Sequence, residues 1–115
     1  MDTVPKFLQG IYSFEGIGLH KPILLDTDLV YSVPRDKRAQ LIYFRAGNSC
    51  SDLICLALIR DGALMRLFPI GAKSDSHVSL AVVEDLFPET RLEVFVAAPA
   101  GTAGTVVLDI GLVEI

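Results

Sequence analysis

The 115-residue sequence has no tryptophan, only two cysteines and only two histidines. The missing tryptophan and the close spacing of Cys50 and Cys55 argue against an immunoglobulin-like sandwich, in which a tryptophan packs against a long-range disulfide. His20 and His77 lie far apart along the chain, so neither belongs to a local cluster of the kind that binds zinc or iron. The motifs of serine hydrolases, phosphate-binding loops and C-x-x-C redox or zinc sites are also missing. The sequence therefore favours a protein that holds no metal or other cofactor and is not an enzyme.

Positive charge and long apolar runs are scarce as well. With 10 basic and 14 acidic residues, the formal net charge is -4, which disfavours binding to nucleic-acid phosphates. The basic segment at residues 35–38 is interrupted by Asp36 and follows Pro34, as expected of a solvated turn. The longest apolar run, residues 53–59, is far shorter than the roughly 20 residues of a membrane-spanning helix. The N-terminal segment lacks the basic start and apolar stretch of a secretory signal, so we expect a cytoplasmic protein without nucleic-acid or membrane partners.

Short apolar clusters are the main feature that is present. Hydrophobic residues make up 51% of the chain, and they occur in short groups separated by glycine, proline, aspartate and asparagine, without helical spacing. This pattern predicts an all-β fold, an antiparallel two-sheet sandwich of jelly-roll type with about eight or nine strands. No linker or repeat divides the chain, so residues 1–115 are expected to form a single domain. The strands are expected at residues 6–14, 17–25, 29–33, 39–46, 51–60, 63–69, 77–83, 91–98 and 105–114.

The clearest local signal is a hairpin from Ser51 to Pro69. Asp61 and Gly62 can supply the two positive φ angles of a type I′ turn, and they join two strands that we expect at the centre of a sheet. Both strands are apolar on both of their alternating faces, whereas the later strands are apolar mainly on one. One face would pack on the core, and the other, with Met65 and Leu67, would need a second cover. We therefore expect a homo-oligomer assembled through this hairpin.

The most suggestive polar group of residues lies at 45–52, where a strand is expected to end in a loop. Arg45, Asn48 and Asp52 together offer a guanidinium, an amide and a carboxylate, which can bind sugar hydroxyls or a small carboxylate. We take these three residues as the candidate ligand site. The alternative is ordinary turn chemistry, with Arg45 paired to Asp52 and Cys50 in an exposed turn. The protein would then be either a binder of a small, carbohydrate-like ligand or an accessory subunit of a larger complex.

Two further hypotheses remain open. The first is a small metal-free jelly-roll enzyme in which His77 acts as general base, with Asp75 or Arg45 nearby. The second is a calcium site at Asp26 and Asp28, whose carboxylates are the hard oxygen ligands that calcium prefers. A turn in which Asp26 accepts a hydrogen bond from the backbone two residues later explains the second motif equally well.

Overall fold

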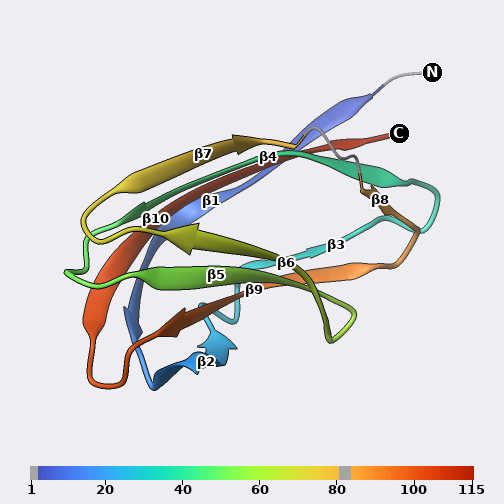
Figure 1. The fold of residues 1–115 in the computed structure, drawn as a ribbon. Coiled ribbons are helices and arrows are strands. Elements are labelled where there is room, and N and C mark those ends of the chain that lie inside the picture. Colours follow the sequence, from blue (N-terminus) through green and yellow to red (C-terminus); the bar gives the residue numbers. More distant parts are fainter. Residues whose placement is uncertain (1–2, 81–83) are drawn as a thin grey trace.

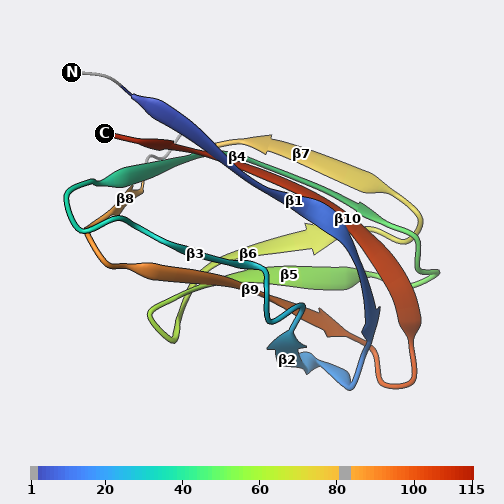
Figure 2. The same cartoon turned by 180° about the vertical axis from the view of Figure 1, so that it is seen from behind.

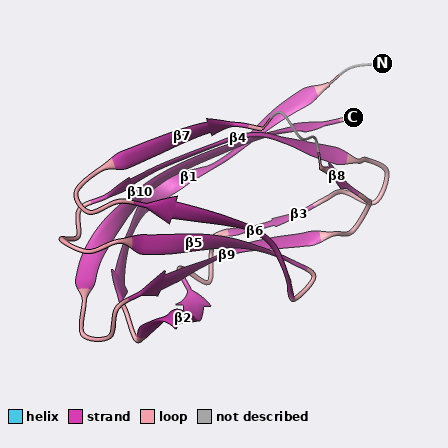
Figure 3. Ribbon diagram, viewed as in Figure 1, coloured by secondary structure: helices cyan, strands magenta, loops and turns pink. Residues whose placement is uncertain are grey.

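The computed structural model describes residues 3–80 and 84–115. Within this part of the chain, ten strands form two antiparallel sheets of five strands each, and no helix occurs (Figures 1 and 3). Sheet A consists, in order, of Val4–Glu15 (β1), Ala103–Glu114 (β10), Ala39–Asn48 (β4) and Asp75–Ser79 (β7), with Asp85–Leu86 (β8) paired to β4. Sheet B consists, in order, of Gly18–Leu24 (β2), Arg91–Ala98 (β9), Ile54–Arg60 (β5) and Ala63–Ile70 (β6), with Val30–Ser32 (β3) paired to β9.

The two sheets stack as the layers of a sandwich, which confirms the predicted fold class. All nine predicted strands are present, with ends that differ by a few residues. The strand expected at residues 77–83 begins earlier, as β7, and residues 81–83 lie outside the described residues. The additional strand, β8, has only two residues and therefore gives no alternating pattern that a sequence could reveal. The described residues contain no helix with the length and apolarity needed to cross a membrane.

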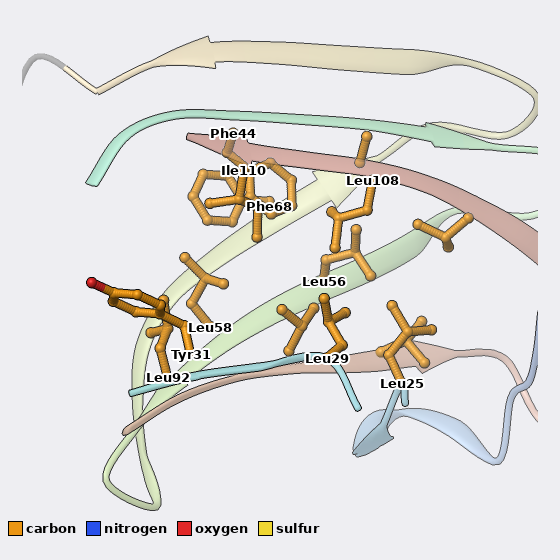
Figure 4. Close-up of a cluster of buried hydrophobic side chains, with 14 of the residues drawn as sticks. Leu25, Leu29, Tyr31, Phe44, Leu56, Leu58, Phe68, Leu92, Leu108 and Ile110 are labelled. Carbon is orange, nitrogen blue, oxygen red and sulfur yellow. The ribbon is translucent and has the colours of Figure 1, made fainter. Parts of the chain in front are cut away.

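The core lies between the two sheets because alternate residues of each strand point inward. Phe44 of β4 stacks on Phe68 of β6, with ring centroids 3.9 Å apart and planes 5° from parallel. Leu56 of sheet B and Leu108 of sheet A point into the same core between the sheets (Figure 4). These contacts join sheet A to sheet B, so the inner face of each sheet packs against the other to form the core.

A buried polar contact also crosses this core. The Tyr31 hydroxyl, on β3, donates a hydrogen bond of 2.6 Å to Glu114 Oε2, on β10, and both residues are buried. Burial, together with the bond to Glu114 and its charge, raises the pKa of Tyr31. A buried carboxylate with a short partner on the opposite sheet favours one alignment of the two sheets over others.

The hairpin between β5 and β6 turns at Asp61 and Gly62, whose φ angles are 50° and 83°. The two positive φ angles expected of this turn are therefore confirmed. The expected central position holds only for β5, which lies between β9 and β6; β6 is the edge of its sheet. The hairpin thus occupies one side of sheet B (Figure 1).

A β-bulge changes which residues of the hairpin face outward. The register slips by one residue between Leu58 and Ile59 of β5, which leaves Met65 without a partner on that strand. Met65 is half-buried and packs against the core, whereas Leu67 is 54% exposed on the outer face. The prediction that both residues form the second face is therefore wrong for Met65 and holds for Leu67.

The first and last strands are neighbours. Strand β1 pairs along its whole length with β10, from Val4 opposite Glu114 to Glu15 opposite Ala103. The two ends of the described chain consequently lie close together, at the same end of sheet A (Figure 2).

Candidate functional site

The three residues predicted as a ligand site are not brought together. Arg45 lies on the outer face of β4, and its Nη1 is 3.6 Å from Oδ2 of Asp109 on the neighbouring strand β10. Asn48 ends β4 and is 4% exposed, while Asp52 lies in the exposed loop beyond it. The alternative pairing of Arg45 with Asp52 is wrong, because the carboxylate that faces Arg45 belongs to Asp109.

Asn48 holds the loop that follows β4. Its Nδ2 donates to the carbonyls of Asp52 and Gly71, at 3.0 and 3.1 Å, and its Oδ1 accepts from the Cys50 N–H at 2.9 Å. Asp52 Oδ2 accepts from the Thr102 hydroxyl at 3.4 Å, which ties the same loop to the turn before β10. These amide contacts are all to backbone atoms, so the geometry gives Asn48 a structural role. Cys50 is buried by this arrangement, at 4% exposure, and the expectation of an exposed turn is wrong.

Arg45 instead belongs to a polar group on the outer face of sheet A, which we call the outer cluster: Tyr43, Arg45, His77 and Asp109. Arg45 stands directly opposite Asp109 on β10 and opposite His77 on β7. Tyr43 is two residues before Arg45 on β4 and therefore shares its face. Strand register thus assembles the outer cluster from three neighbouring strands.

The side chain of Tyr43 lies across β10. Its hydroxyl is 3.0 and 3.1 Å from the two carboxylate oxygens of Asp109. The ring can take this position because the residue opposite Tyr43 is Gly111, where a Cβ atom would overlap the ring. Burial, the hydrogen bond to Asp109 and the charge of Asp109 raise the pKa of Tyr43, while Arg45 opposes this shift. Asp109 is therefore held between a hydroxyl and a guanidinium.

A hollow of about 370 Å³ opens beside the outer cluster. Arg45, Asp109 and His77 line it together with Asp75 and the wall residue Val107, which is 55% exposed. The Tyr43 ring meets the His77 ring edge to face, with centroids 6.0 Å apart and planes at 83°. One guanidinium and two carboxylates surround the opening, so its fixed side-chain charges sum to a negative value.

Sequence reasoning found part of the outer cluster. Arg45 was one of the three predicted ligand residues, and His77 with Asp75 formed the alternative catalytic set. Tyr43 and Asp109 were missed as site residues. The spacing of Tyr43 and Arg45 places them on one strand face, but Asp109 follows much later in the chain. Only the register between β4 and β10 joins them, and a single sequence does not contain that register.

The acidic pair at Asp26 and Asp28 is explained by a turn. Asp26 Oδ1 accepts the Asp28 N–H at 3.0 Å, the bond expected of this alternative. Within residues 3–80 and 84–115, no group of three or more His, Cys, Asp or Glu side chains is placed to hold a metal ion. The geometry gives the calcium hypothesis no further support.

No protein-family model and no curated protein sequence matches the chain. Among solved structures, the chain is similar to the insecticidal delta-endotoxin Cry8Ea1 of Bacillus thuringiensis, with a TM-score of 0.50 and 14% identity over 90% of this chain and 19% of that one. It is also similar to a protein of infectious bursal disease virus, Gx strain (TM-score 0.46, 14% identity, 98% of this chain and 36% of that one). A third similar structure is that of a Paenibacillus sp. cycloisomaltooligosaccharide glucanotransferase complexed with cycloisomaltoheptaose (TM-score 0.41, 19% identity, 96% of this chain and 18% of that one).

The chain spans about a fifth of the toxin and of the glucanotransferase, and little more than a third of the viral protein. At 14% identity, the similarity to the toxin shows a shared β-sandwich fold alone. Fold does not define function, so the function has to be inferred from the outer cluster itself.

Proposed function

We propose that this β-sandwich is a non-catalytic binding module whose ligand is a small uncharged molecule rich in hydroxyl groups, of the carbohydrate class. The ligand occupies the hollow beside the outer cluster. The observation that carries this proposal is that the Asp109 carboxylate contacts both the Tyr43 hydroxyl and the Arg45 guanidinium. These contacts fix a hydrogen-bond acceptor, Asp109, beside a donor, Arg45, at the hollow. Fixed polar groups at the edge of a concave surface are what gives a polar ligand its orientation.

The distance within the ion pair suits a hydroxyl ligand. Arg45 Nη1 and Asp109 Oδ2 are 3.6 Å apart, longer than the roughly 2.8 Å of a tight charge-assisted hydrogen bond. The Arg45 side chain is 58% exposed, so its remaining N–H groups face solvent. Two neighbouring hydroxyls of a sugar ring can accept from Arg45 and donate to Asp109 at the same time. A sugar therefore uses both members of the pair without separating them.

Charge argues against an anionic ligand. Asp75 and Asp109 together outweigh Arg45 at the hollow, so a carboxylate or phosphate would meet net repulsion. The exposed Val107 side chain adds an apolar surface to the lining of the hollow, which suits the C–H face of a sugar ring. These two features support an uncharged polyol over a small carboxylate, the other ligand class that the sequence left open.

The proposal is tested by titrating the isotope-labelled protein with a panel of neutral mono- and oligosaccharides and following the backbone amide signals by NMR. For at least one sugar, signals from Arg45, His77 and Val107 should shift together. Arg45→Ala should weaken that binding at least tenfold, roughly 1.4 kcal/mol, because the donor half of the pair is lost.

Arg35→Ala is the matched control. Arg35 is an exposed arginine that pairs with Glu89 at 3.1 Å and does not line the hollow. Arg35→Ala changes the net charge of the protein by the same amount as Arg45→Ala, and it should leave sugar binding unchanged. The proposal fails if no sugar in the panel shifts these signals. It also fails if Arg45→Ala and Arg35→Ala weaken binding to the same extent.

The catalytic alternative concerns the same hollow. Asp75 and His77 are two residues apart on β7 and share its outer face. Arg45 lies opposite His77 on β4, so the three residues are close together, as that hypothesis requires. The two functions are separated by incubating a bound sugar with the protein and looking for product. Turnover that His77→Gln removes would favour the enzyme, whereas an unchanged sugar with binding intact favours the binding module.

A further inference from the structure

A second hollow lies on the outer face of sheet A, next to the hollow beside the outer cluster, which we now call the first hollow. The volume of the second hollow is about 550 Å³, against about 370 Å³ for the first. The two hollows share Gly47, Asp75 and Val107 in their linings. Gly47 of β4 stands opposite Val107 of β10 and opposite Asp75 of β7, so these three residues form one cross-strand row between the hollows.

This row is lowest at its centre, because Gly47 has no side chain. A Cβ atom at residue 47 would lie 4.0 Å from the Cβ atoms of Asp75 and Val107, its nearest neighbours across the strands. Asp75 and Val107 are both exposed and stand on either side of Gly47. A glycine at such a place lets another molecule approach the backbone closely. The two hollows are therefore connected over Gly47.

Hydrogen bonds hold the walls of the second hollow in place. The Asn48 N–H donates to the Ser74 carbonyl at 2.8 Å, which joins the end of β4 to the turn before β7. Ser49 and Thr105 are joined twice: the Ser49 N–H donates to the Thr105 carbonyl at 3.1 Å, and the Thr105 N–H donates to Ser49 Oγ at 2.9 Å. Three segments of the chain are thus tied together, and a ligand that binds there has little chain to order.

The polar groups of the second hollow suit the ligand class proposed for the first. Ser49, Thr105 and Lys73 contribute hydroxyl groups and an ammonium group to its lining. The positive charge of Lys73 balances the negative charge of Asp75, so the fixed side-chain charges of this hollow sum to zero. An uncharged ligand rich in hydroxyls therefore finds hydrogen-bonding groups there without an unbalanced charge.

We propose that the ligand is an oligosaccharide of at least two sugar units that lies along β4 and occupies both hollows across Gly47. This inference rests on the proposed function, to which it adds a second subsite. Arg45 and Ser49, at the two ends of the joined surface, are four residues apart on the chain. In an extended chain this is about 13 Å, longer than one sugar ring. Lys73 donates to the second sugar unit, and the missing side chain at Gly47 lets the ligand pass between the subsites.

The test compares a monosaccharide with its own linear oligomers. The isotope-labelled protein is titrated with glucose, mannose and galactose and with the dimers and trimers of each, and the backbone amide signals are followed by NMR. The sugar that binds should do so at least tenfold more tightly as an oligomer, because its second unit binds at high effective concentration once the first is held. The monosaccharide should shift the signals of Arg45 and His77, and the oligomers should also shift those of Ser49 and Lys73.

Lys73→Gly removes the donor of the second subsite. Glycine is the replacement because residue 73 has a φ of 49°, which glycine adopts without strain. The oligomer should lose most of its advantage, while the affinity for the monosaccharide stays the same. Lys21→Ala is the matched control, since Lys21 is an exposed lysine on β2 of the other sheet and its loss changes the net charge equally. In this control the oligomer should keep its full advantage.

Gly47→Val tests the connection between the subsites. Valine suits a strand and would fill the space between Asp75 and Val107, so the ratio of the two affinities should fall toward one although Lys73 is retained. Should Gly47→Val fail to fold, Lys73→Gly decides the question by itself.

The outcomes separate this inference from the proposed function. Equal affinities for the monosaccharide and its oligomers would overturn the second subsite and leave the first hollow as the binding site. The same conclusion follows if the oligomers shift no signal from Ser49 or Lys73, or if Lys73→Gly behaves like Lys21→Ala. If no sugar binds at all, both proposals fail.

Discussion

The two outer faces of this sandwich differ in how their side chains are held. On sheet A, Tyr43, Asp109 and Arg45 are fixed to one another by polar contacts whose strength depends on distance and direction. On sheet B, outward side chains such as Leu64 and Leu67 are apolar and largely exposed, and the burial of apolar surface has no preferred direction. One fold therefore presents one outer surface with fixed polar groups and another that is mainly apolar. Three predictions test this difference, beginning with the largest effect.

Gly111→Ala should have the largest effect on the sheet A face. The new Cβ overlaps the Tyr43 ring, so the ring must leave β10 and its bond to Asp109 breaks. We expect a loss of about 2 kcal/mol in the free energy of unfolding, measured in urea, together with the loss of sugar binding.

Gly47→Ala is the control for this substitution. Gly47 lies on the same face, but a Cβ there would only touch the Cβ atoms of Asp75 and Val107, at 4.0 Å. Stability should stay constant or rise by up to about 1 kcal/mol, because alanine restricts the unfolded chain. If Gly111→Ala and Gly47→Ala lowered the free energy of unfolding equally, the position of the Tyr43 ring would not depend on Gly111.

Tyr43→Phe should have an intermediate effect. It removes the hydrogen bond to Asp109 and should lower the free energy of unfolding by about 1 kcal/mol, a value reduced by the partial exposure of the pair. The pKa of Tyr43 is raised in the folded state. The wild-type protein should therefore be more stable than Tyr43→Phe by a constant amount below pH 10.0, and this difference in the free energy of unfolding should disappear as the pH rises through the raised pKa. Unfolding curves at neutral and alkaline pH measure both effects.

Tyr12→Phe supplies the comparison for that variant. Its hydroxyl donates to the Gln9 carbonyl over 3.5 Å at an exposed site, so its removal should cost less than about 0.5 kcal/mol. A loss as large as that of Tyr43→Phe would contradict the assignment of the stronger contact to the outer cluster.

Salt should produce the smallest effect. Sodium chloride screens Arg45 and Asp109, so sugar binding should weaken by no more than about twofold between low and physiological salt. A weakening of much more than twofold would show that sugar binding depends on charge and not on the hydrogen bonds of the pair.

The strands and the Asp61–Gly62 turn could be predicted because their signals are local. Alternation of apolar residues gives the strands, and the Asp61–Gly62 pair carries its own backbone preference. Met65 shows where this reasoning stops. A bulge between β5 and β6 turns Met65 toward the core, and nothing in its immediate sequence distinguishes it from Leu67.

The candidate site depended on contacts between distant segments, which explains why it was only partly predicted. Arg45 was identified from its residue type and its place near a loop, but its partner comes from the last strand. Asn48 and Asp52 have the same polar character, and their amide and carboxylate are used to hold loops in place. Residue type shows which chemistry is available, whereas the register of the strands decides where it is used.

The pairing of β1 with β10 has a consequence for the order of folding. During synthesis, the segment that becomes β1 is made before the other described strands, and β10, its neighbour in sheet A among the described residues, is made after them. Until then, Phe7 and Ile11 belong to an extended apolar segment without a sheet to join, which is a site for misdirected pairing between nascent chains. In sheet B, β5 and β6 can pair as soon as their hairpin is made, and β2 and β3 wait for β9, which is complete before β10. The sandwich should therefore close from sheet B toward sheet A, with the joining of the chain ends as its slow step.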